Sequence, residues 1–455
     1  MKTRLFGSSG ARGLINVELT PILAAQVGLA VAGFSRARGI LIARDTRISG
    51  SMLEDALVSG SSAGGATALC IGVVPTPVLA FLTKELRADA GVMITASHNP
   101  PQYNGIKIFD HNGLAYGEKN QNKIEKVIEN QDFAFADWQT IGQQQHVDKS
   151  SLYVEMIKKN IMLKKKWHTI LDPGCGATYN LAPTVFNTLG CKVTAINAQP
   201  DGCFPARSSE PNSESLKSLA KIVKELGADA GAAYDGDGDR VAFIDEKGSF
   251  VDFDRVLAAY AAYVIRKRNG GVAVTNVEAS MCFDKMVEKE GGKVIRTKVG
   301  DIYVSEAMKT HRAIFGGEPC GAWIHPEFHL CPDGILSSIL LLKALEEEDK
   351  TLSEFASEAP RYEILRRSIA CKNEMKHRIV KDAGARLKKA FPKYKDFSVV
   401  DGIRLASEDG WVLVRASGTE PLVRLTVEAK SMKTAKEMMN VSVRLVKESV
   451  GGKKE

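Results

Sequence analysis

Short hydrophobic runs alternate with longer helical stretches over the first part of the chain. Residues 39–43, 91–95 and 169–172 are apolar runs of the length typical of buried strands. Residues 51–68 and 182–189 lie between such runs and have the hydrophobic spacing of helices. Strands that alternate with helices in this order predict parallel sheets with crossover helices.

The end of the chain has a different pattern. Residues 411–415 and 422–428 indicate two paired strands across a glycine-containing loop, and a helix is expected over residues 434–447. Strands that pair through a short loop before one helix are typical of an α+β domain.

Polar or proline-containing stretches separate these regions. They lie at residues 131–150, 247–248 and 360–372, and the last of them looks like a hinge into the final domain. The fold class that we predict is α/β, with three mixed α/β domains and a smaller α+β C-terminal domain. The predicted boundaries are 1–150, 151–249, 250–364 and 365–455.

The composition is that of an ordinary globular protein. Hydrophobic residues make up 44% and charged residues 25% of the 455 residues. The best candidate for a membrane span, residues 23–34, contains Gln26 and is shorter than the ~18 residues that a span needs. The N-terminus lacks the long apolar core of a secretory signal. We therefore expect a cytoplasmic location and no membrane partner.

Cysteines and charge exclude further classes. The eight cysteines are scattered and form no Cys-x-x-Cys pair, so neither a zinc site nor a disulfide framework is expected. The net charge of +7 fits either a solvated basic surface or the attraction of anionic substrates. Nucleic-acid binding would require a concentrated basic stripe, so we expect no nucleic-acid partner.

Three aspartates at alternate positions are the strongest chemical signal in the sequence. Asp235, Asp237 and Asp239 are separated by glycines. On an extended segment, alternate side chains point the same way, and neighbouring carboxylates repel one another unless a cation lies between them. Ligands that are all oxygen suit a hard cation such as Mg²⁺ or Ca²⁺.

A calcium-binding EF-hand is the main alternative for this motif, and a solvated acidic turn is another. Glu246 fits position 12 of an EF-hand loop, but position 6 should be glycine and is Arg240. The flanking residues 230–234 and 241–245 indicate strands rather than helices. We therefore favour a magnesium site that leaves room for a phosphate oxygen.

The sequence TASHNPPQYNGIK, which starts at Thr95, is a second motif. It follows the predicted strand 91–95, and binding sites in open α/β sheets lie at the carboxyl ends of strands. Ser97 is therefore placed to present its hydroxyl, with His98 and Lys107 as proton-transfer or cationic groups. Taken alone, a Ser-His pair carries little weight, because neighbours in sequence need not face each other.

Three further loops are compatible with binding an anion or a sugar. The segment 415–421 combines hydroxyl, backbone N–H and guanidinium donors that suit a phosphate, although a plain hairpin turn explains it as well. The glycine-rich segment 7–13 fits either an anion-binding loop or a flexible entry to the first strand. In the segment 316–321, Glu318 could accept hydrogen bonds from sugar hydroxyls.

Together these motifs resemble the α-D-phosphohexomutase family over essentially the whole chain, and most of all its archaeal phosphoglucosamine mutases. TASHNP looks like the phosphoserine loop of the family, DGDGDR like its metal loop, GEPCG like its sugar-recognition loop and RASGTEP like its phosphate loop. The opening FGSSGARG is similar to its N-terminal substrate loop. The resemblance implies that the four domains surround a central cleft and serve, in chain order, as phosphoserine, metal-binding, sugar-recognition and phosphate-binding domains.

The resemblance also implies roles for individual residues, with Lys107 as the preferred general acid or base. The implied catalytic residues are Ser97, which would be phosphorylated, His98, Lys107 and Arg12. The implied ligands of Mg²⁺ are the phosphate of Ser97, Asp235, Asp237 and Asp239. The implied substrate-binding residues are Arg240, Gly300, Glu318, Cys320, Arg415, Ser417, Gly418 and Thr419.

The predicted reaction converts glucosamine 6-phosphate into glucosamine 1-phosphate through a phosphoserine and a sugar bisphosphate. The alternative is a phosphomannomutase/phosphoglucomutase, because no loop indicates a pocket for an ammonium group. Cys320 stands where the family usually has serine, and Ala322 where some members have histidine. Since cysteine is a weak hydrogen-bond partner, recognition of sugar hydroxyls would depend more on Glu318.

Two other classes of protein explain the motifs less well. A sugar-phosphate-binding protein without turnover would not need Ser97 beside basic groups. A phosphatase would release free phosphate, whereas a last domain that closes over the site should exclude water and suppress this release. The partner that we expect is a hexose or hexosamine phosphate. A homodimer is compatible with the sequence, which does not determine the oligomeric state.

Overall fold

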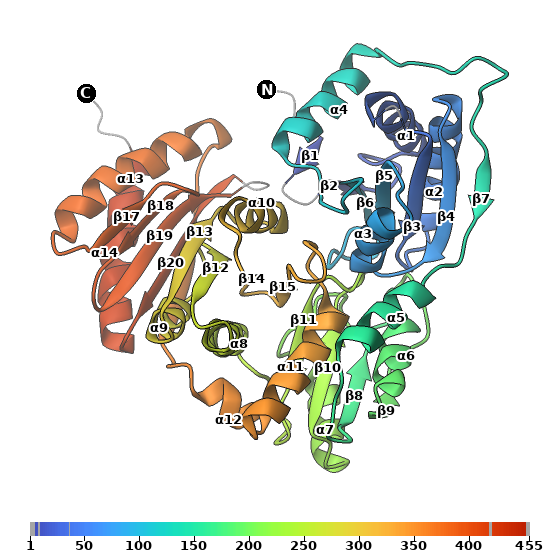
Figure 1. The fold of residues 1–455 in the computed structure, drawn as a ribbon. Helices are drawn as coiled ribbons and strands as arrows, with labels where there is room; N and C mark the ends of the chain where they lie inside the picture. Colours follow the sequence, from blue (N-terminus) through green and yellow to red (C-terminus); the bar gives the residue numbers. More distant parts are fainter. Residues whose placement is uncertain (1–4, 8–9, 36, 418–420, 452–455) are drawn as a thin grey trace. The chain divides into compact units, whose positions relative to one another are not determined.

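A computed structural model describes residues 5–7, 10–35, 37–417 and 421–451. The chain divides into two compact units. The first unit contains Met1–Phe253 and Gly300–Ala356, and the second contains Asp254–Val299 and Ser357–Glu455. Figure 1 shows the order of the elements in each.

A seven-stranded mixed sheet opens the first unit (Figure 1). Its strands are β1 (Phe6–Gly7), β2 (Gly10–Leu14), β3 (Gly39–Arg44), β4 (Thr67–Val73), β5 (Ala90–Ile94), β6 (Tyr103–Asp110) and β7 (Gln144–His146). Their order is β1-β2-β6-β5-β3-β4-β7. β3 runs parallel to both β4 and β5, whereas β6 runs antiparallel to β5 and β2. The parallel centre was predicted from the apolar runs at residues 39–43 and 91–95.

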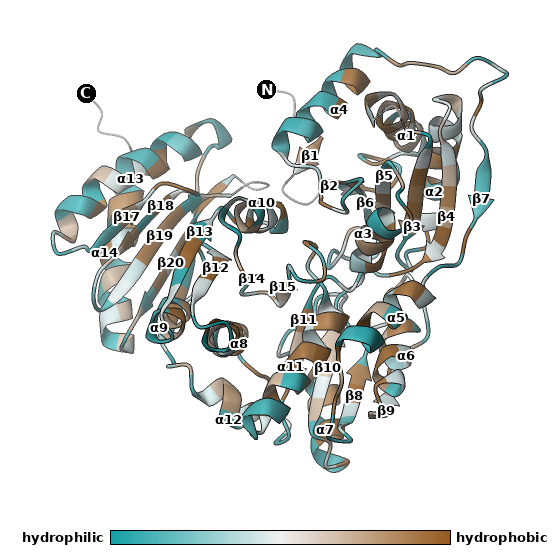
Figure 2. Ribbon diagram, in the orientation of Figure 1, coloured by the Kyte–Doolittle hydropathy of each residue, from teal (hydrophilic) through white to brown (hydrophobic). Residues whose placement is uncertain are grey.

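Four helices alternate along the chain with the strands of this sheet. They are α1 (Pro21–Ser35), α2 (Gly50–Ala63), α3 (Thr76–Glu85) and α4 (Glu118–Asn130). Figure 2 shows mostly hydrophilic residues along α4 and hydrophobic residues along β3 and β4. Strands this apolar lie in the core, where Ile40, Leu41 and Ile42 are fully buried.

Helices α1 and α2 approach each other closely at two glycines. A Cβ atom on Gly28 would lie 2.3 Å from the backbone oxygen of Leu57, and one on Gly60 would lie 1.9 Å from that of Ala25. Side chains at these positions would force the helices apart.

Within the described ranges, no helix combines the length and the hydrophobicity that crossing a bilayer requires.

The helix predicted over residues 51–68 is shorter than expected. It ends at Ala63, because Gly64 and Gly65 follow and Gly65 has a φ of 85°, which an α-helix cannot contain. Thr67 already begins β4. The apolar residues at the end of the predicted helix therefore belong to a strand.

A second sheet follows in the first unit, with the order β11-β10-β8-β9. Its strands are β8 (His168–Asp172), β9 (Lys192–Ala195), β10 (Ala230–Tyr234) and β11 (Val241–Ile244). β8 runs parallel to β9 and β10, and β11 runs antiparallel to β10. The remaining elements of the unit are α5 (Ser151–Asn160), α6 (Leu181–Thr188), α7 (Lys217–Glu225), α10 (Asp301–His311), β14 (Phe315–Glu318), β15 (Ala322–Ile324), α11 (Gly334–Glu348) and α12 (Leu352–Ser357).

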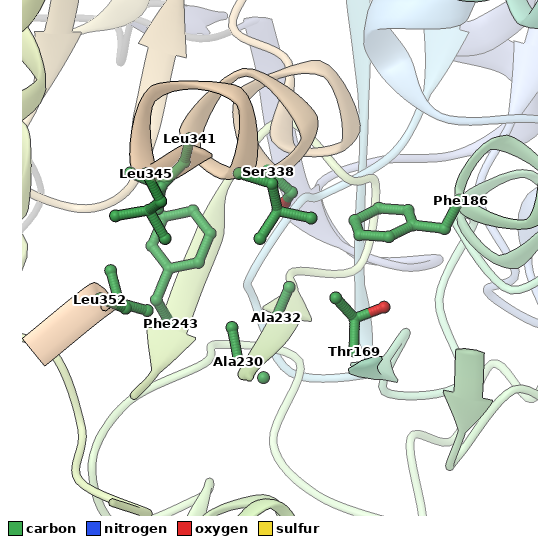
Figure 3. A pocket seen from close by; sticks show the side chains of 11 residues that line it. Thr169, Phe186, Ala230, Ala232, Phe243, Ser338, Leu341, Leu345 and Leu352 are labelled. Carbon is green, nitrogen blue, oxygen red and sulfur yellow. The ribbon is translucent and has the colours of Figure 1, made fainter. Parts of the chain in front are cut away.

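A small cavity lies between α11 and this second sheet (Figure 3). Apolar side chains that include Phe186, Phe243 and Leu341 line it. Its volume is about 10 Å³, which is close to the space that a single water molecule needs. The cavity is therefore a packing gap of the core and not a place for a substrate.

The second unit contains a five-stranded antiparallel sheet, with the order β16-β20-β19-β18-β17. Its strands are β16 (Glu363–Ala370), β17 (Asp396–Ser398), β18 (Ile403–Ala406), β19 (Gly410–Ala416) and β20 (Leu422–Ala429). The other elements of the unit are α8 (Phe253–Lys267), β12 (Gly271–Asn276), α9 (Met281–Lys289), β13 (Gly292–Thr297), the 3₁₀ helix η1 (Asn373–Met375), α13 (Lys376–Ala390) and α14 (Met432–Gly451). Residues of α13 and α14 share a hydrophobic core with this sheet, which is the α+β arrangement that we predicted.

The C-terminal strands match their prediction, but the hinge does not. β19 and β20 pair antiparallel, with Val414 opposite Leu425. The stretch 360–372, predicted as a hinge, contains β16, which pairs along its whole length with β20. The stretch is polar because Arg366 and Arg367 lie on an edge strand, where exposed charged side chains are common.

A buried carboxylate joins two parts of the second unit. Glu428, on β20, accepts hydrogen bonds from Ser280 Oγ at 2.6 Å and from Trp411 Nε1 at 2.7 Å. The backbone N–H of Met281, at the start of α9, also donates to it at 3.2 Å. A carboxylate at a helix N-terminus is favoured by the helix dipole.

We predict that Glu428→Ala destabilises the protein by about 2 kcal/mol, because it leaves buried donors of Ser280 and Trp411 without an acceptor. The urea midpoint, followed by circular dichroism, should fall. Glu437→Ala, at an exposed position of α14, is the matched control and should leave the midpoint unchanged. Equal midpoints for the two variants would contradict the prediction.

Candidate active site

The candidate site begins at one edge of the first sheet. β4, β3 and β5 are parallel neighbours, so their carboxyl ends lie side by side. Arg47 and Ser97 lie in the turns after β3 and β5, and Thr76, which follows β4, is the first residue of α3. Ser97 therefore stands where the sequence predicted it, at the carboxyl end of a buried strand.

The acidic motif forms the turn between β10 and β11. Ligand oxygens of Asp235, Asp237 and Asp239 all lie within 4.8 Å of one another, and the three residues are buried. We predicted this convergence from side-chain alternation on an extended segment. The structure achieves it differently, through a turn in which Gly238 has a φ of 73°.

Ser97 and the acidic turn meet. The Ser97 hydroxyl donates a hydrogen bond to Asp235 Oδ2 at 2.7 Å, and Ser97 is 1% exposed. A Cβ atom on Gly236 would lie 2.5 Å from the backbone oxygen of Ser97. Glycine at this position is therefore required for the turn to approach the serine.

Lys107 lies between the other two carboxylates. Its Nζ donates to Asp237 Oδ2 at 2.8 Å and to Asp239 Oδ2 at 2.7 Å. Burial alone would lower the pKa of Lys107, but the charges of Asp237 and Asp239 outweigh burial and raise the pKa. Lys107 is thus a bound ammonium group here, which can donate a proton but cannot accept one.

The carboxylates carry more negative charge than the site neutralises. Burial, together with the charges of Asp239 and Asp237, raises the pKa of Asp235 far above its usual value. Burial, and then the charge of Asp237, also raises the pKa of Asp239. The charge of Arg240 opposes both shifts, and a divalent cation among the three carboxylates would favour their ionised forms further.

The oxygen atoms of the turn fit such a cation. Asp237 Oδ1 and Asp239 Oδ1 are buried and have no hydrogen-bond partner. Buried polar atoms are rarely left without a partner, and carboxylate oxygens are the ligands that Mg²⁺ prefers. The donor set is therefore suited to a hard divalent cation.

Thr76 fixes the central carboxylate. Its hydroxyl donates to Asp237 Oδ2 at 2.5 Å, and its backbone N–H donates to the Asp237 carbonyl at 2.9 Å. Burial would raise the pKa of Asp237, but Lys107 and Thr76 together keep it below its usual value. Lys107 and Thr76 thus keep Asp237 ionised, and Thr76 also orients its carboxylate.

Two arginine side chains, those of Arg12 and Arg240, lie close to the residues around Ser97. Arg12 donates through Nη1 to Asn99 Oδ1 at 2.9 Å, whereas its buried Nε has no partner. Arg240 lies 3.9 Å from a carboxylate oxygen of Glu210, which is beyond hydrogen-bond distance. The two guanidinium groups therefore retain donors for an anion such as phosphate.

His98 contacts Ser97, although adjacency in sequence does not require it. His98 Nδ1 lies 3.2 Å from Ser97 Oγ. Burial lowers the pKa of His98 to about 2, and the charges of Arg240 and Arg12 act in the same direction. At neutral pH His98 is therefore a neutral hydrogen-bond partner and not a cation.

The predicted sugar-binding residues lie together in the first unit. Glu318 is buried, and its Oε1 accepts a hydrogen bond from the backbone N–H of Gly300 at 2.8 Å. Cys320 is half-buried, and burial raises its pKa to about 12 although the charge of Arg240 opposes this. Its side chain is thus a neutral thiol.

The predicted phosphate loop belongs to the second unit. Arg415 donates through Nη1 to Asp401 Oδ2 at 2.9 Å, and its Nη2 lies 3.2 Å from Glu278 Oε1. The carbonyl oxygen of Ser417 accepts a hydrogen bond from Lys376 Nζ at 2.6 Å. The two other predicted residues of this loop, Gly418 and Thr419, lie outside the described residues.

Sequence reasoning missed Arg47 and Thr76. Arg47 follows a strand that the sequence predicted, and Thr76 follows β4, which it did not predict. Neither residue belongs to a motif of its own. A signal was available: polar residues after parallel neighbouring strands reach the same sheet edge as Ser97. Recognising it would have required the strand order, which the sequence pattern does not give.

The chain matches the phosphoglucomutase/phosphomannomutase family along most of its length. The matched regions are alpha/beta/alpha domain I at residues 3–135, domain II at 151–248, domain III at 252–362 and the C-terminal domain at 369–443.

Curated relatives and a solved structure are similar over almost the whole chain. A protein of Pyrococcus abyssi named probable phosphoglucosamine mutase is 42% identical over 447 residues, which is 98% of each chain. The phosphoglucosamine mutase of Methanocaldococcus jannaschii is 41% identical over 98% of this chain and 99% of its own. A phosphoglucomutase/phosphomannomutase family protein of Burkholderia thailandensis has a TM-score of 0.89 at 27% identity, covering 99% of both chains.

We predict that Thr76→Val weakens divalent-cation binding about tenfold, because Asp237 loses the hydroxyl that orients it. Titration of the purified protein with Mn²⁺, followed by electron paramagnetic resonance, measures the affinity directly. Thr76→Ser keeps the hydroxyl and should restore it.

Thr83→Val is the matched control for this prediction. Thr83 is buried in the same helix, but its hydroxyl donates to the Leu79 carbonyl and not to the acidic turn. Its affinity for Mn²⁺ should equal that of the wild type. Unchanged affinity in Thr76→Val would contradict the role given to Thr76.

Proposed function

Because this chain belongs to the phosphoglucomutase/phosphomannomutase family, we propose that it is a phosphohexomutase that interconverts glucosamine 6-phosphate and glucosamine 1-phosphate. The observation that carries the proposal is the hydrogen bond from Ser97 Oγ to Asp235 Oδ2. It joins a buried serine hydroxyl to a carboxylate cluster suited to a divalent cation. A serine that serves only the fold would not need such surroundings.

The proposed reaction moves one phosphoryl group at a time. The phosphate on Ser97 passes to a free hydroxyl of the hexosamine phosphate: the bond from phosphorus to Ser97 Oγ breaks and a bond to the sugar oxygen forms. The product is a hexosamine 1,6-bisphosphate. It turns around, and its other phosphate returns to Ser97, which restores the phosphoserine and releases the isomer. As the new bond to phosphorus forms, the sugar hydroxyl loses its proton, and Ser97 Oγ gains one as the phosphate leaves, so atoms and charge balance in each transfer.

We propose Mg²⁺ as the cation of the site, held by Asp235, Asp237, Asp239 and a phosphate oxygen on Ser97. When bound, it offsets negative charge as the phosphoryl group moves. The ordering of the carboxylates by Thr76 and Lys107 keeps the ligands in place before the substrate arrives.

The other groups around Ser97 have complementary roles in this proposal. Arg12 and Arg240 bind the oxygens of the transferring phosphoryl group through the donors that they retain. Lys107 donates its proton to Ser97 Oγ as the phosphate leaves and, once neutral, takes up the proton that the sugar hydroxyl loses. His98, as a neutral imidazole, orients the serine.

The second unit would hold the phosphate that does not react. Arg415, Ser417, Gly418 and Thr419 are the proposed donors. A cradle that accepts either phosphate of the bisphosphate is needed because both ends of the sugar are presented to Ser97 in turn.

Glucosamine is the proposed sugar because the two curated relatives reported above are named for it. Glu318 is the proposed partner of the sugar, and its carboxylate suits an ammonium group at carbon 2 as well as hydroxyls. The neutral thiol of Cys320 adds little to recognition. Mannose and glucose phosphates are the competing substrates. We further propose that the reaction takes place in the cytoplasm, and a homodimer remains a prediction.

We predict that the protein turns over glucosamine 6-phosphate faster than mannose 6-phosphate or glucose 6-phosphate, measured as kcat/KM with Mg²⁺ and a catalytic amount of bisphosphate. Equal or greater kcat/KM with mannose 6-phosphate would contradict the proposed substrate and support the alternative mutase.

We also predict that Ser97→Ala loses most turnover, by about 10³-fold or more, and keeps sugar-phosphate binding, because only the acceptor of the phosphoryl group is removed. Intact mass spectrometry should find one added phosphate in the wild type and none in the variant. A wild type phosphorylated at another residue would show that the mechanism is wrong.

A further inference from the structure

Arg47 follows β3, and its side chain is fully buried. Its Nε donates to Asp45 Oδ2 at 3.0 Å. The two Nη atoms donate to four backbone carbonyl oxygens, those of Pro100 (2.7 Å), Tyr103 (2.9 Å), Ser97 (2.9 Å) and Asn99 (2.6 Å). All five guanidinium N–H groups therefore have an acceptor.

The four carbonyl oxygens all belong to the loop that carries the reactive serine. Residues 97–102 form no helix or strand. The Arg47 guanidinium therefore supplies hydrogen bonds to their backbone carbonyl oxygens that secondary structure would otherwise supply. Lysine has three donors on a single nitrogen and cannot bind acceptors on both sides of a planar fork. The arrangement thus depends on arginine specifically.

Both backbone polar groups of Ser97 are held by hydrogen bonds. Its carbonyl accepts from Arg47, and its N–H donates to Thr95 Oγ1 at 2.8 Å. The Thr95 hydroxyl in turn donates to Asp45 Oδ2 at 2.7 Å, the same atom that receives Arg47 Nε. These four residues form one connected network around the serine.

Ser97 adopts a backbone conformation that is unfavourable for its type. Its φ is 52°, in the left-handed region that residues with a Cβ atom rarely occupy. Such a conformation persists only where the surroundings determine it, and it directs Ser97 Oγ at Asp235. Loosening Arg47 should therefore let Ser97 relax and turn its oxygen away.

The network also reaches the acidic turn. The ring of Phe204 lies 5.0 Å from Arg47 Cζ, within the range of a cation–π interaction. A Cβ atom on Gly236 would lie 3.4 Å from that ring and 2.5 Å from the Ser97 carbonyl oxygen. The Phe204 ring thus lies between Arg47 and the acidic turn.

We propose that Arg47 is a positioning residue for phosphoryl transfer: it holds the phosphoserine loop so that Ser97 Oγ faces the acidic turn. The proposal rests on the proposed function, because it assigns Arg47 to the phosphoserine of that reaction. Arg47 contacts neither the sugar nor the phosphate in this scheme and acts through Ser97.

The test compares Arg47→Lys with Arg44→Lys, after each protein is phosphorylated with glucosamine 1,6-bisphosphate. Arg44 is a matched control, since it lies on the same strand end and pairs with Glu54 at 2.8 Å, away from the serine loop. We expect kcat of Arg47→Lys to fall about ten- to a hundredfold with KM changed less than threefold, and Arg44→Lys to match the wild type.

A second readout separates positioning from stability. The ³¹P resonance of phosphorylated Ser97 should shift toward that of a free phosphoserine peptide in Arg47→Lys and stay in place in Arg44→Lys. If Arg47→Lys does not fold, Phe204→Leu, which removes the ring but no hydrogen bond, should show the same shift to a smaller degree.

The outcomes are distinct. A wild-type kcat and ³¹P resonance in Arg47→Lys, or in Phe204→Leu where that variant is needed, would overturn the positioning role and leave the mutase reaction intact. A wild type that acquires no phosphate on Ser97 would overturn the proposed function, and this inference with it.

Discussion

Three carboxylates buried within 4.8 Å of one another are the constraint on which the site depends. Lys107 and Arg240, whose Nε lies 4.0 Å from Asp239 Oδ1, offset only part of the charge of the three carboxylates, and burial with mutual repulsion still raises the pKa of Asp235 and Asp239. A divalent cation would balance the remaining charge. The dianionic phosphate that we propose on Ser97 would then need further positive groups, and Arg12 and Arg240 lie where they can meet it.

The topology explains how residues so distant in sequence reach one place. Parallel strands end at the same sheet edge, so the segments that follow β3, β4 and β5 bring Arg47, Thr76 and Ser97 together. The second sheet contributes the acidic turn after β10. Each sheet carries half of the chemistry: the first has the serine and the residues that orient it, and the second has the carboxylates.

The sequence predicted the parts of this site that have a local signature. Asp235, Asp237 and Asp239 are recognisable because their spacing concentrates charge, and Ser97 because a buried strand precedes it. Arg47 and Thr76 escaped prediction because their importance lies in contacts with residues about 50 and 160 positions away. No local pattern encodes such contacts. The end of α2 was misplaced because short apolar runs fit either a helix or a strand until pairing decides. The strand at Glu363–Ala370 was missed because a polar edge strand resembles a linker until its pairing is known.

The central claim is that Ser97 and the acidic turn share one divalent cation. A crystal structure of the phosphorylated protein with Mn²⁺, phased at the manganese absorption edge, tests it most directly. The account predicts one strong anomalous peak bonded to Asp235, Asp237, Asp239 and a phosphate oxygen on Ser97. A peak elsewhere, or none, would contradict it.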